Sequence, residues 1–381
     1  MKTYLSIMGT RPEIIKMAVL HRVLKERGDR SLVLHTGQHG EMADVLYRFF
    51  DMVPDLRIDL RRSSPGLAHL TALLLENVDR VIEETQPDVV LVQGDTTSAF
   101  VGALAGYYHD KPVGHVEAGL RTGTRDPFPE EKNREMIGRL AAWHFPPTSQ
   151  SRLNLLNEGV PDERIFEVGN TVIDAALWVR DRLAATGWDA GEAMPDELRR
   201  FLVEHDGRHI VLITAHRREN WGEPIRGIAT AVGHLLGDFP NAVAVWPVHP
   251  NPRVRADVEA VVNALPRTSR SRICLTQPLD YPALMSVLAR CRFTLTDSGG
   301  IQEEASALAR PVLITRNATE RQELLLAGGA RLVGTDVRQI VEQSATLLGD
   351  DAAWRAMQLP ASPFGDGRSA RRIADILATV T

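Results

Sequence analysis

The sequence predicts an α/β protein with two domains, each built on a parallel β-sheet that helices cover on both faces. Short apolar runs alternate with longer amphipathic runs, which is the βαβα order of this fold class. The apolar runs are nearly continuous, as in strands that are buried on both faces. The chain has 381 residues, which is more than one hydrophobic core ordinarily serves.

The first half of the chain alternates predicted strands and helices. The strands are expected at residues 3–8, 31–37, 88–95 and 112–119. The helices are expected at residues 13–28, 41–50, 77–86 and 96–110. Gly28 ends the first helix, and Pro87 ends the third because proline cannot continue a helix.

A charged, strand-poor segment at about 175–207, which contains Pro195, interrupts this alternation. The pattern resumes with predicted strands at 209–216, 242–250, 273–276, 293–300, 310–316 and 330–335, and with a helix at 281–291. A second βα domain is therefore expected at roughly 170–360. The amphipathic run 370–380 predicts a final helix that could pack on either domain.

Composition excludes several classes of protein. A formal net charge of −5 argues against a surface that gathers nucleic-acid phosphates. Cys274 and Cys291 lie in no metal or disulfide pattern and are expected to be buried apolar residues. Arg11 and Pro12 interrupt the apolar N-terminus, and no run approaches the roughly 18 apolar residues of a membrane span. We therefore expect a cytoplasmic protein that binds neither nucleic acid nor membrane.

Polar clusters follow six of the predicted strands. They read GTRPE, GDTT and HVEAGLRTG in the first half, and TAHRREN, PVHPNP and TDSGG in the second. Ligands of open parallel sheets bind at the carboxyl ends of strands. Any one of these clusters could simply supply the residues that a turn needs. Six charge-rich turns favour a binding site instead. The six would surround a single cleft if the two sheets face each other.

The cluster TDSGG predicts a seat for an anion. Ser298 fits the N-cap of the following helix, while Gly299 and Gly300 allow a ligand to approach the backbone. Free N–H groups and the helix dipole then favour phosphate, although an ordinary capped helix remains the alternative. The chain contains neither a G-x-G-x-x-G nor a P-loop motif.

Cationic side chains accompany this seat. His216 and His249 follow two strands of the second half and predict a cationic rim together with neighbouring arginines. Arg11 and Lys16 follow the first strand and could meet phosphates, although a surface Arg–Glu pair explains Arg11 equally well.

Four carboxylates, Asp95, Glu117, Glu130 and Glu131, mark the strand ends of the first half. Desolvation and mutual repulsion are expected to raise some of their pKa values toward neutral, which suits proton transfer. Metal binding and helix capping are the alternatives. No Mg-type D-x-D motif accompanies these acids, so we predict proton transfer and no metal site. Phosphate-seeking and acidic groups together suit a nucleotide-linked substrate whose other end undergoes acid–base chemistry.

Nine motifs in chain order support a resemblance. They are GTRPEIIKMA, GDTTSAF, VGHVEAGLRTG, PFPEEKNR, GNTVIDA, TAHRRENWG, PVHPNP, LTDSGGIQEEA and NATERQE. With them the chain closely resembles the non-hydrolysing UDP-N-acetylglucosamine 2-epimerases over essentially its whole length.

The resemblance implies the GT-B architecture, in which two Rossmann-like domains face each other across a central cleft. The expected domains are 1–170, which carries the catalytic carboxylates, and 171–365, which binds UDP, with the C-terminal helix 366–381 joining the first. The implied reaction is reversible inversion at C2 of UDP-N-acetylglucosamine to UDP-N-acetylmannosamine without a cofactor. It proceeds by elimination of UDP to a 2-acetamidoglucal and re-addition, and it would supply sugars for cell-surface polysaccharides.

The resemblance also assigns roles. Glu117 and Asp95 become the acid/base groups, assisted by Glu130, and His216 stabilises the departing UDP; which carboxylate removes the proton and which returns it stays open. The substrate-binding positions that match are Arg11, Lys16, Arg134, His249, Ser298, Gly299, Gly300, Glu304 and Arg321. Glu304 is expected to accept hydrogen bonds from the ribose, and Glu303 receives no role.

Family members are often homodimers, and many are activated by a second UDP-N-acetylglucosamine. Gln38 and His39 match that activating site, but Gly40 and Ser64 stand at or near positions where regulated members carry arginine. Activation is therefore left open. The alternatives to the main assignment are a hydrolysing epimerase, an epimerase of a modified UDP-HexNAc, a GT-B glycosyltransferase and a non-catalytic nucleotide-sugar sensor.

Overall fold

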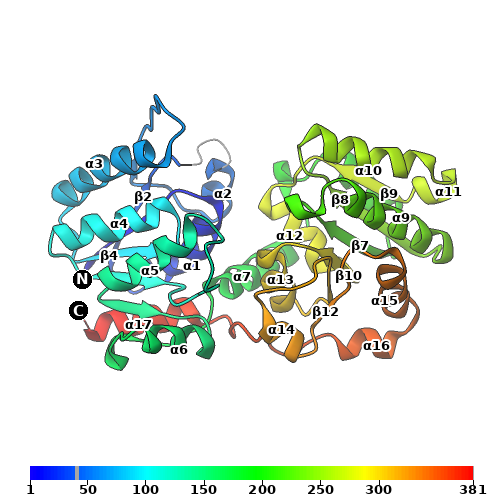
Figure 1. The fold of residues 1–381 in the computed structure, drawn as a ribbon. Coiled ribbons are helices and arrows are strands. Elements are labelled where there is room, and N and C mark those ends of the chain that lie inside the picture. Colours follow the sequence, from blue (N-terminus) through cyan, green and yellow to red (C-terminus); the bar gives the residue numbers. More distant parts are fainter. Residues whose placement is uncertain (39–42, 381) are drawn as a thin grey trace. The chain divides into compact units, whose positions relative to one another are not determined.

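The structure, a computed structural model, describes residues 1–38 and 43–380 and contains two compact units (Figure 1). The N-terminal unit comprises Met1–Ala175 and Phe364–Thr381, and the C-terminal unit comprises Ala176–Pro363. The chain thus passes between the units twice, within helix α7 (Thr171–Ala185) and after Pro363.

A six-stranded parallel sheet forms the centre of the N-terminal unit, in the order β3-β2-β1-β4-β5-β6. This is the strand order of a Rossmann fold, in which the order reverses between the first and fourth strands. The strands are β1 (Thr3–Met8), β2 (Arg30–His35), β3 (Leu56–Arg57), β4 (Val89–Gln93), β5 (Val113–Val116) and β6 (Trp143–Phe145).

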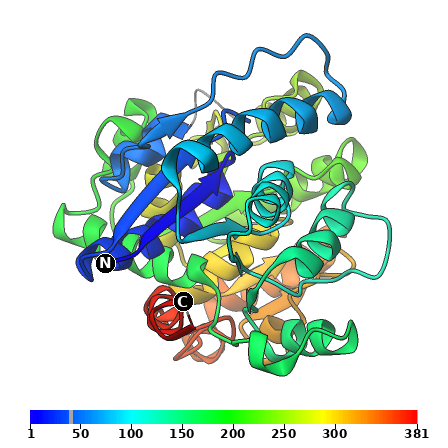
Figure 2. The same ribbon diagram turned by 90° about the vertical axis from the view of Figure 1, so that its left-hand side faces the viewer.

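Helices cover both faces of this sheet (Figures 1 and 2). Helices α3, α4 and α5 pack in one layer, whereas α17 and α2 pack beside α1. The helices are α1 (Arg11–Glu26), α2 (Ala43–Phe49), α3 (Leu67–Thr85), α4 (Thr97–Tyr108), α5 (Glu130–Leu140), α6 (Ser149–Asn157) and α17 (Ser369–Val380). The C-terminal helix α17 thus belongs to the N-terminal unit and contacts the first helix of the chain.

The C-terminal unit repeats the Rossmann order in its own parallel sheet, β12-β11-β10-β7-β8-β9. Its strands are β7 (His209–Thr214), β8 (Ala242–Pro247), β9 (Ile273–Thr276), β10 (Phe293–Thr296), β11 (Val312–Ile314) and β12 (Ala330–Leu332). Its helices are α8 (Asp196–Glu204), α9 (Glu223–Asp238), α10 (Pro252–Ala264), α11 (Arg267–Arg270), α12 (Tyr281–Arg290), α13 (Gly299–Ala307), α14 (Gln322–Leu326), α15 (Val337–Gly349) and α16 (Asp351–Ala356). Two Rossmann-like parallel sheets confirm the predicted fold class.

Helix α3 departs from its predicted bounds. It begins at Leu67, ten residues before the predicted start at 77. Its buried side chains recur at Leu70, Leu74 and Val78, which is a helical spacing that extends into the preceding segment. The short strands β3 and β6 were not predicted, because two or three residues give no period.

Cys274 and Cys291 are both buried and unpaired, as expected. Burial raises the pKa of each thiol to about 12, so neither is a reactive thiolate near neutral pH. Within residues 1–38 and 43–380, no three His, Cys, Asp or Glu side chains gather to hold a metal ion. None of the helices in this part of the chain has the length and apolar character to span a membrane.

Candidate active site

Two strand ends in the N-terminal unit carry the predicted acid–base residues Asp95 and Glu117. Strands β1, β4 and β5 are neighbours in the sheet, and the strand order reverses between β1 and β4. Asp95 follows β4, and Glu117 follows β5 directly. Asp95 therefore lies beside the topological switch point, where open α/β sheets bind their ligands, and Glu117 follows the adjacent strand.

Three side chains converge on the Glu117 carboxylate. Lys16 Nζ lies 2.5 Å from Oε1, Asn170 Nδ2 donates to the same oxygen at 2.9 Å, and Gln93 Nε2 donates to Oε2. Glu117 is 8% exposed and has a positive φ of 64°, a strained conformation that is frequent at functional sites. Lys16, predicted to meet a phosphate, is thus part of the acid–base cluster in this structure.

Asn170 was not predicted, although it is the second residue of the GNTVIDA motif. Its Oδ1 accepts a hydrogen bond from the Val172 N–H, which fixes the amide orientation and turns Nδ2 toward Glu117. Its own N–H donates to Phe364 O at 2.7 Å. Asn170 therefore joins Glu117 to the segment where the chain re-enters the N-terminal unit.

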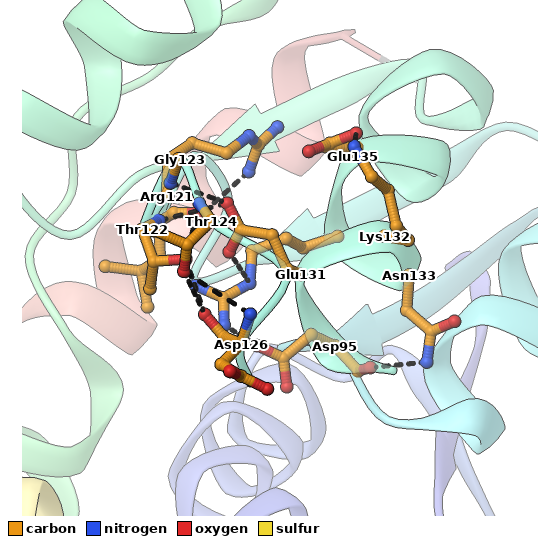
Figure 3. Close-up of polar contacts among 12 residues, drawn as sticks. Asp95, Arg121, Thr122, Gly123, Thr124, Asp126, Glu131, Lys132, Asn133 and Glu135 are labelled. Carbon is orange, nitrogen blue, oxygen red and sulfur yellow. Dashed lines mark hydrogen bonds and ion pairs between the residues drawn. The ribbon is translucent and has the colours of Figure 1, made fainter. Parts of the chain in front are cut away.

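Asp95 has the perturbed acidity that the sequence predicted. Burial raises its pKa to about 6, with Glu117 and Glu130 adding to the rise and Arg134 opposing it. The Arg134 guanidinium lies 3.1 Å from Asp95 Oδ2. Asn133 Nδ2 donates to the Asp95 carbonyl and holds the backbone of this turn (Figure 3). A carboxyl group with this pKa exchanges protons readily near neutral pH.

Glu131 has a structural role in the loop that follows β5. Its Oε1 accepts hydrogen bonds from the N–H groups of Thr122 and Gly123 at 3.0 and 3.1 Å (Figure 3). It is 1% exposed, and its Oε2 lies 3.6 Å from Arg134 Nε. Glu131 therefore fixes the loop that follows HVEAGL, whereas Glu130 is half-buried at the first position of α5.

Glu13 is a buried carboxylate that the sequence analysis missed. It accepts hydrogen bonds from the N–H groups of Gly9 and Thr10, from the Thr10 hydroxyl and from the Thr96 hydroxyl. Burial raises its pKa. Because Thr96 follows Asp95, Glu13 ties the turn after β1 to the turn that carries Asp95. The T-x-x-E spacing of a capping box was the available signal.

His115 supports the same turn from within β5. Its Nε2 lies 2.7 Å from the Gly94 carbonyl, and Gly94 has a φ of 68° that glycine tolerates best. Burial lowers the pKa of His115 to about 3. The ring is therefore neutral and donates its Nε2 proton to this carbonyl over the whole working pH range.

In the C-terminal unit, Asp297 organises the turn that carries His216. The fully buried Asp297 accepts hydrogen bonds at Oδ2 from the N–H groups of His216 and Arg217 and from Asn220 Nδ2. Its Oδ1 lies 3.2 Å from His216 Nδ1. A proton on Nδ1 is favoured there, which directs Nε2 away from the carboxylate. Half of the His216 side chain is exposed, as a group that meets substrate requires.

His249 differs from the expected cationic residue. Its Nδ1 accepts a hydrogen bond from the Asn251 N–H, so this nitrogen carries no proton, and the ring lies 5.5 Å from the Trp221 ring. Burial, together with His216, lowers the pKa of His249. The lowered pKa favours the neutral ring, and a role of His249 in substrate binding stays a prediction. A neutral ring with a proton on Nε2 remains as a hydrogen-bond donor.

Ser298 is the N-cap residue of α13, as predicted, but its side chain makes no capping hydrogen bond. Its own N–H donates to Thr296 Oγ1. Gly299 is buried and Gly300 is exposed at the helix start. Glu304, further along α13, is 7% exposed and adds to the burial effect that raises the pKa of Tyr281. The helix start thus has the open backbone that an anion seat requires.

The predicted activating site is only partly described. Gln38 Oε1 accepts a hydrogen bond from Ser98 Oγ at 2.7 Å. His39 and Gly40 lie outside the described residues. Activation by a second nucleotide sugar therefore stays a prediction, as does the homodimer.

The two Rossmann-like sheets and the ionisable groups at their strand ends define an α/β enzyme. The family model described as UDP-N-acetylglucosamine 2-epimerase matches residues 22–378. A UDP-N-acetylglucosamine 2-epimerase of Yersinia pestis is 43% identical over 375 residues, covering 98% of this chain and 97% of its own. Its Escherichia coli K12 counterpart is 42% identical over 380 residues, covering 98% and 97%.

A solved structure shows the same fold. The UDP-GlcNAc 2-epimerase of Neisseria meningitidis bound to UDP-GlcNAc superposes with a TM-score of 0.85 at 35% identity, covering 99% of this chain and 100% of its own. The chain belongs to the UDP-N-acetylglucosamine 2-epimerase family.

Proposed function

We propose that the protein interconverts UDP-N-acetylglucosamine and UDP-N-acetylmannosamine by eliminating UDP and adding it back. The observation that carries the proposal is the pair of carboxylates Asp95 and Glu117 after neighbouring strands, in different environments. Asp95, with a pKa of about 6, is poised to accept or donate a proton. Glu117 is surrounded by three donors that stabilise its ionised form.

The elimination breaks the C2–H and C1–O bonds and forms a C1–C2 double bond. One carboxylate takes the C2 proton, and the bonding pair of the C1–O bond leaves with the UDP oxygen. Re-addition protonates C2 from the opposite face, which inverts its configuration and returns UDP to C1. Two groups are therefore needed, and Asp95 and Glu117 supply them, with Glu130 assisting.

The departing diphosphate requires positive charge and hydrogen-bond donors. In the C-terminal unit, the start of α13, Arg321, His216 and the His249 ring are suited to that work. Glu304 is the carboxylate proposed for the ribose hydroxyls. Electrostatic stabilisation of a leaving group is commonly worth about 10²–10³ in rate for one donor.

A non-hydrolysing enzyme must also return UDP to the intermediate before water adds. Admission of water would give free N-acetylmannosamine and UDP, which is the hydrolysing alternative. The relatives named UDP-N-acetylglucosamine 2-epimerase and the Neisseria meningitidis enzyme bound to UDP-GlcNAc support this substrate, and the product of the reaction distinguishes the two alternatives.

Incubation of the protein with UDP-N-acetylglucosamine in heavy water tests the proposal by proton NMR. We expect UDP-N-acetylmannosamine to appear with deuterium at C2, and deuterium to enter the recovered substrate. Accumulation of free N-acetylmannosamine would replace the proposal with the hydrolysing enzyme. Absence of both exchange and product would reject epimerisation of this substrate, and the same assay with modified UDP-HexNAc sugars would then test the alternative substrate.

A further inference from the structure

The first residue of the acidic pair in QEE, Glu303, lies in a buried ion pair within α13. Its Oε1 accepts a hydrogen bond from Arg321 Nε at 2.9 Å, and Arg321 Nη2 lies 2.9 Å from the same oxygen in an ion pair. Glu303 is 4% exposed, and the Arg321 side chain is 22% exposed. A carboxylate this deeply buried is stable only with such a partner, so the pair has a defined geometry.

Gly299 makes room for the guanidinium. A Cβ atom at Gly299 would lie 2.8 Å from Arg321 Cζ and 3.0 Å from Nη1. Any side chain at this position would therefore displace the arginine. Since Gly299 is the first residue of α13, the guanidinium lies directly beside the N–H groups of the helix start.

The segment that carries Arg321 is itself fastened to α13. The Thr319 hydroxyl donates to Gln302 Oε1 at 2.7 Å and accepts a hydrogen bond from the Arg321 N–H at 3.2 Å. Both partners on the helix, Gln302 and Glu303, precede Glu304 in the sequence. Two consecutive residues of α13 thus fix the backbone and the side chain of the arginine together.

We propose that Glu303 is a positioning residue that holds the Arg321 guanidinium beside the start of α13 for the diphosphate of the substrate. This inference deepens the proposed function and rests on it. Glu303 lies beyond the first turn of the helix, where its own charge acts weakly on the anion seat and is compensated by Arg321. Two glutamates can then follow an anion-binding helix start, because Glu303 pairs with Arg321 and Glu304 accepts hydrogen bonds from the ribose.

Arginine presents a rigid, planar fork of donors, so its orientation decides how well it binds a phosphate. Nε and Nη2 are directed to the buried Glu303, and the half-exposed Glu320 lies further away, 3.7 Å from Nη1, so Glu303 is the main constraint that keeps the guanidinium beside Gly299. Loss of the carboxylate leaves the charge of Arg321 in place but releases its orientation. The expected consequence is weaker binding of UDP with little change in binding of uridine, which lacks the diphosphate.

The test is a double-mutant cycle on the full chain, with the dissociation constants of UDP and uridine measured by calorimetry. We expect Glu303→Gln to weaken UDP binding about tenfold and Arg321→Ala about 30-fold or more. The double variant should bind UDP within twofold of Arg321→Ala alone, because Glu303 acts only through the arginine. Uridine binding should change less than threefold in all three variants.

Asp351→Asn provides the matched control, because it removes the carboxylate partner of another arginine, Arg292, in the same unit. It should leave UDP binding unchanged, and Glu303→Asp should recover part of the affinity lost in Glu303→Gln. Thermal unfolding of each variant, with and without UDP, shows whether it is folded.

Three outcomes would overturn the inference while leaving the proposed function intact. In the first, Glu303→Gln binds UDP within twofold of the unmodified protein. In the second, Glu303→Gln weakens UDP binding by the same factor whether residue 321 is arginine or alanine. In the third, Glu303→Gln weakens the binding of UDP and of uridine by the same factor. Failure of the unmodified protein to bind UDP would instead remove the proposed function and this inference with it.

Discussion

Replacement of Glu117 by glutamine should abolish deuterium incorporation at C2 while UDP still binds. Glutamine keeps the shape of the side chain but cannot take up a proton, and acid–base groups contribute about 10²–10⁴ in rate. We expect at least a 10³-fold loss of exchange, measured by proton NMR in heavy water. The dissociation constant of UDP should change less than threefold, because the proposed diphosphate seat lies in the C-terminal unit.

Glu158→Gln is the control for this variant. This substitution also removes an ion pair in the N-terminal unit, the one between Glu158 and Arg121, but Glu158 has no assigned role in proton transfer. It should retain exchange within a few-fold of the unmodified protein. If UDP affinity collapsed in Glu117→Gln, Glu117 would be a ligand-holding residue and its assignment to the chemistry would be wrong.

Asp95→Asn is expected to inactivate the enzyme and to stabilise its fold at pH 8. The folded-state pKa of Asp95 is about 6, above the ordinary value of 3.8, so ionisation of this carboxyl opposes folding. The cost is absent below about pH 3.8, grows as the pH rises to 6 and is complete above it. Asparagine removes that cost and the proton-transfer group together.

The gain in stability should be modest. A shift of about two pKa units corresponds to roughly 3 kcal/mol, but the Asp95 side chain is 25% exposed and pairs with Arg134, so we expect about 1–2 kcal/mol. Urea unfolding at pH 8 and pH 4 measures the free energy of unfolding. The difference in this free energy between the variant and the unmodified protein should be smaller at pH 4 than at pH 8. If Asp95→Asn were less stable than the unmodified protein at pH 8, the claim that ionisation of Asp95 opposes folding would be wrong.

The sequence located the main strands because nearly continuous apolar runs mark buried parallel strands, although most predicted strands extend two to four residues beyond the observed carboxyl ends. It therefore located Asp95 and Glu117, each of which follows such a run. It also predicted that burial would raise carboxyl pKa values, which Asp95 confirms. These predictions depend on local pattern, and local pattern is what a single sequence records.

The sequence could not predict contacts between side chains that are far apart along the chain. Asn170 and Gln93 reach Glu117 across 53 and 24 residues, and only the folded sheet and the returning chain bring them together. Glu303 received no role because Arg321 lies 18 residues away, on another element. Nor could the sequence predict that Asn251 would leave His249 unprotonated at Nδ1.

The most direct test of the account is positional isotope exchange in UDP-N-acetylglucosamine that carries ¹⁸O in the bond between C1 and the β-phosphate. If the enzyme eliminates UDP, the freed β-phosphate rotates before re-addition, and ³¹P NMR will show ¹⁸O moving from the bridging to the non-bridging positions. The movement should accompany C2 inversion and should be lost in Glu117→Gln. Inversion at C2 with the label retained in the bridge would contradict cleavage of the C1–O bond and with it the proposed mechanism.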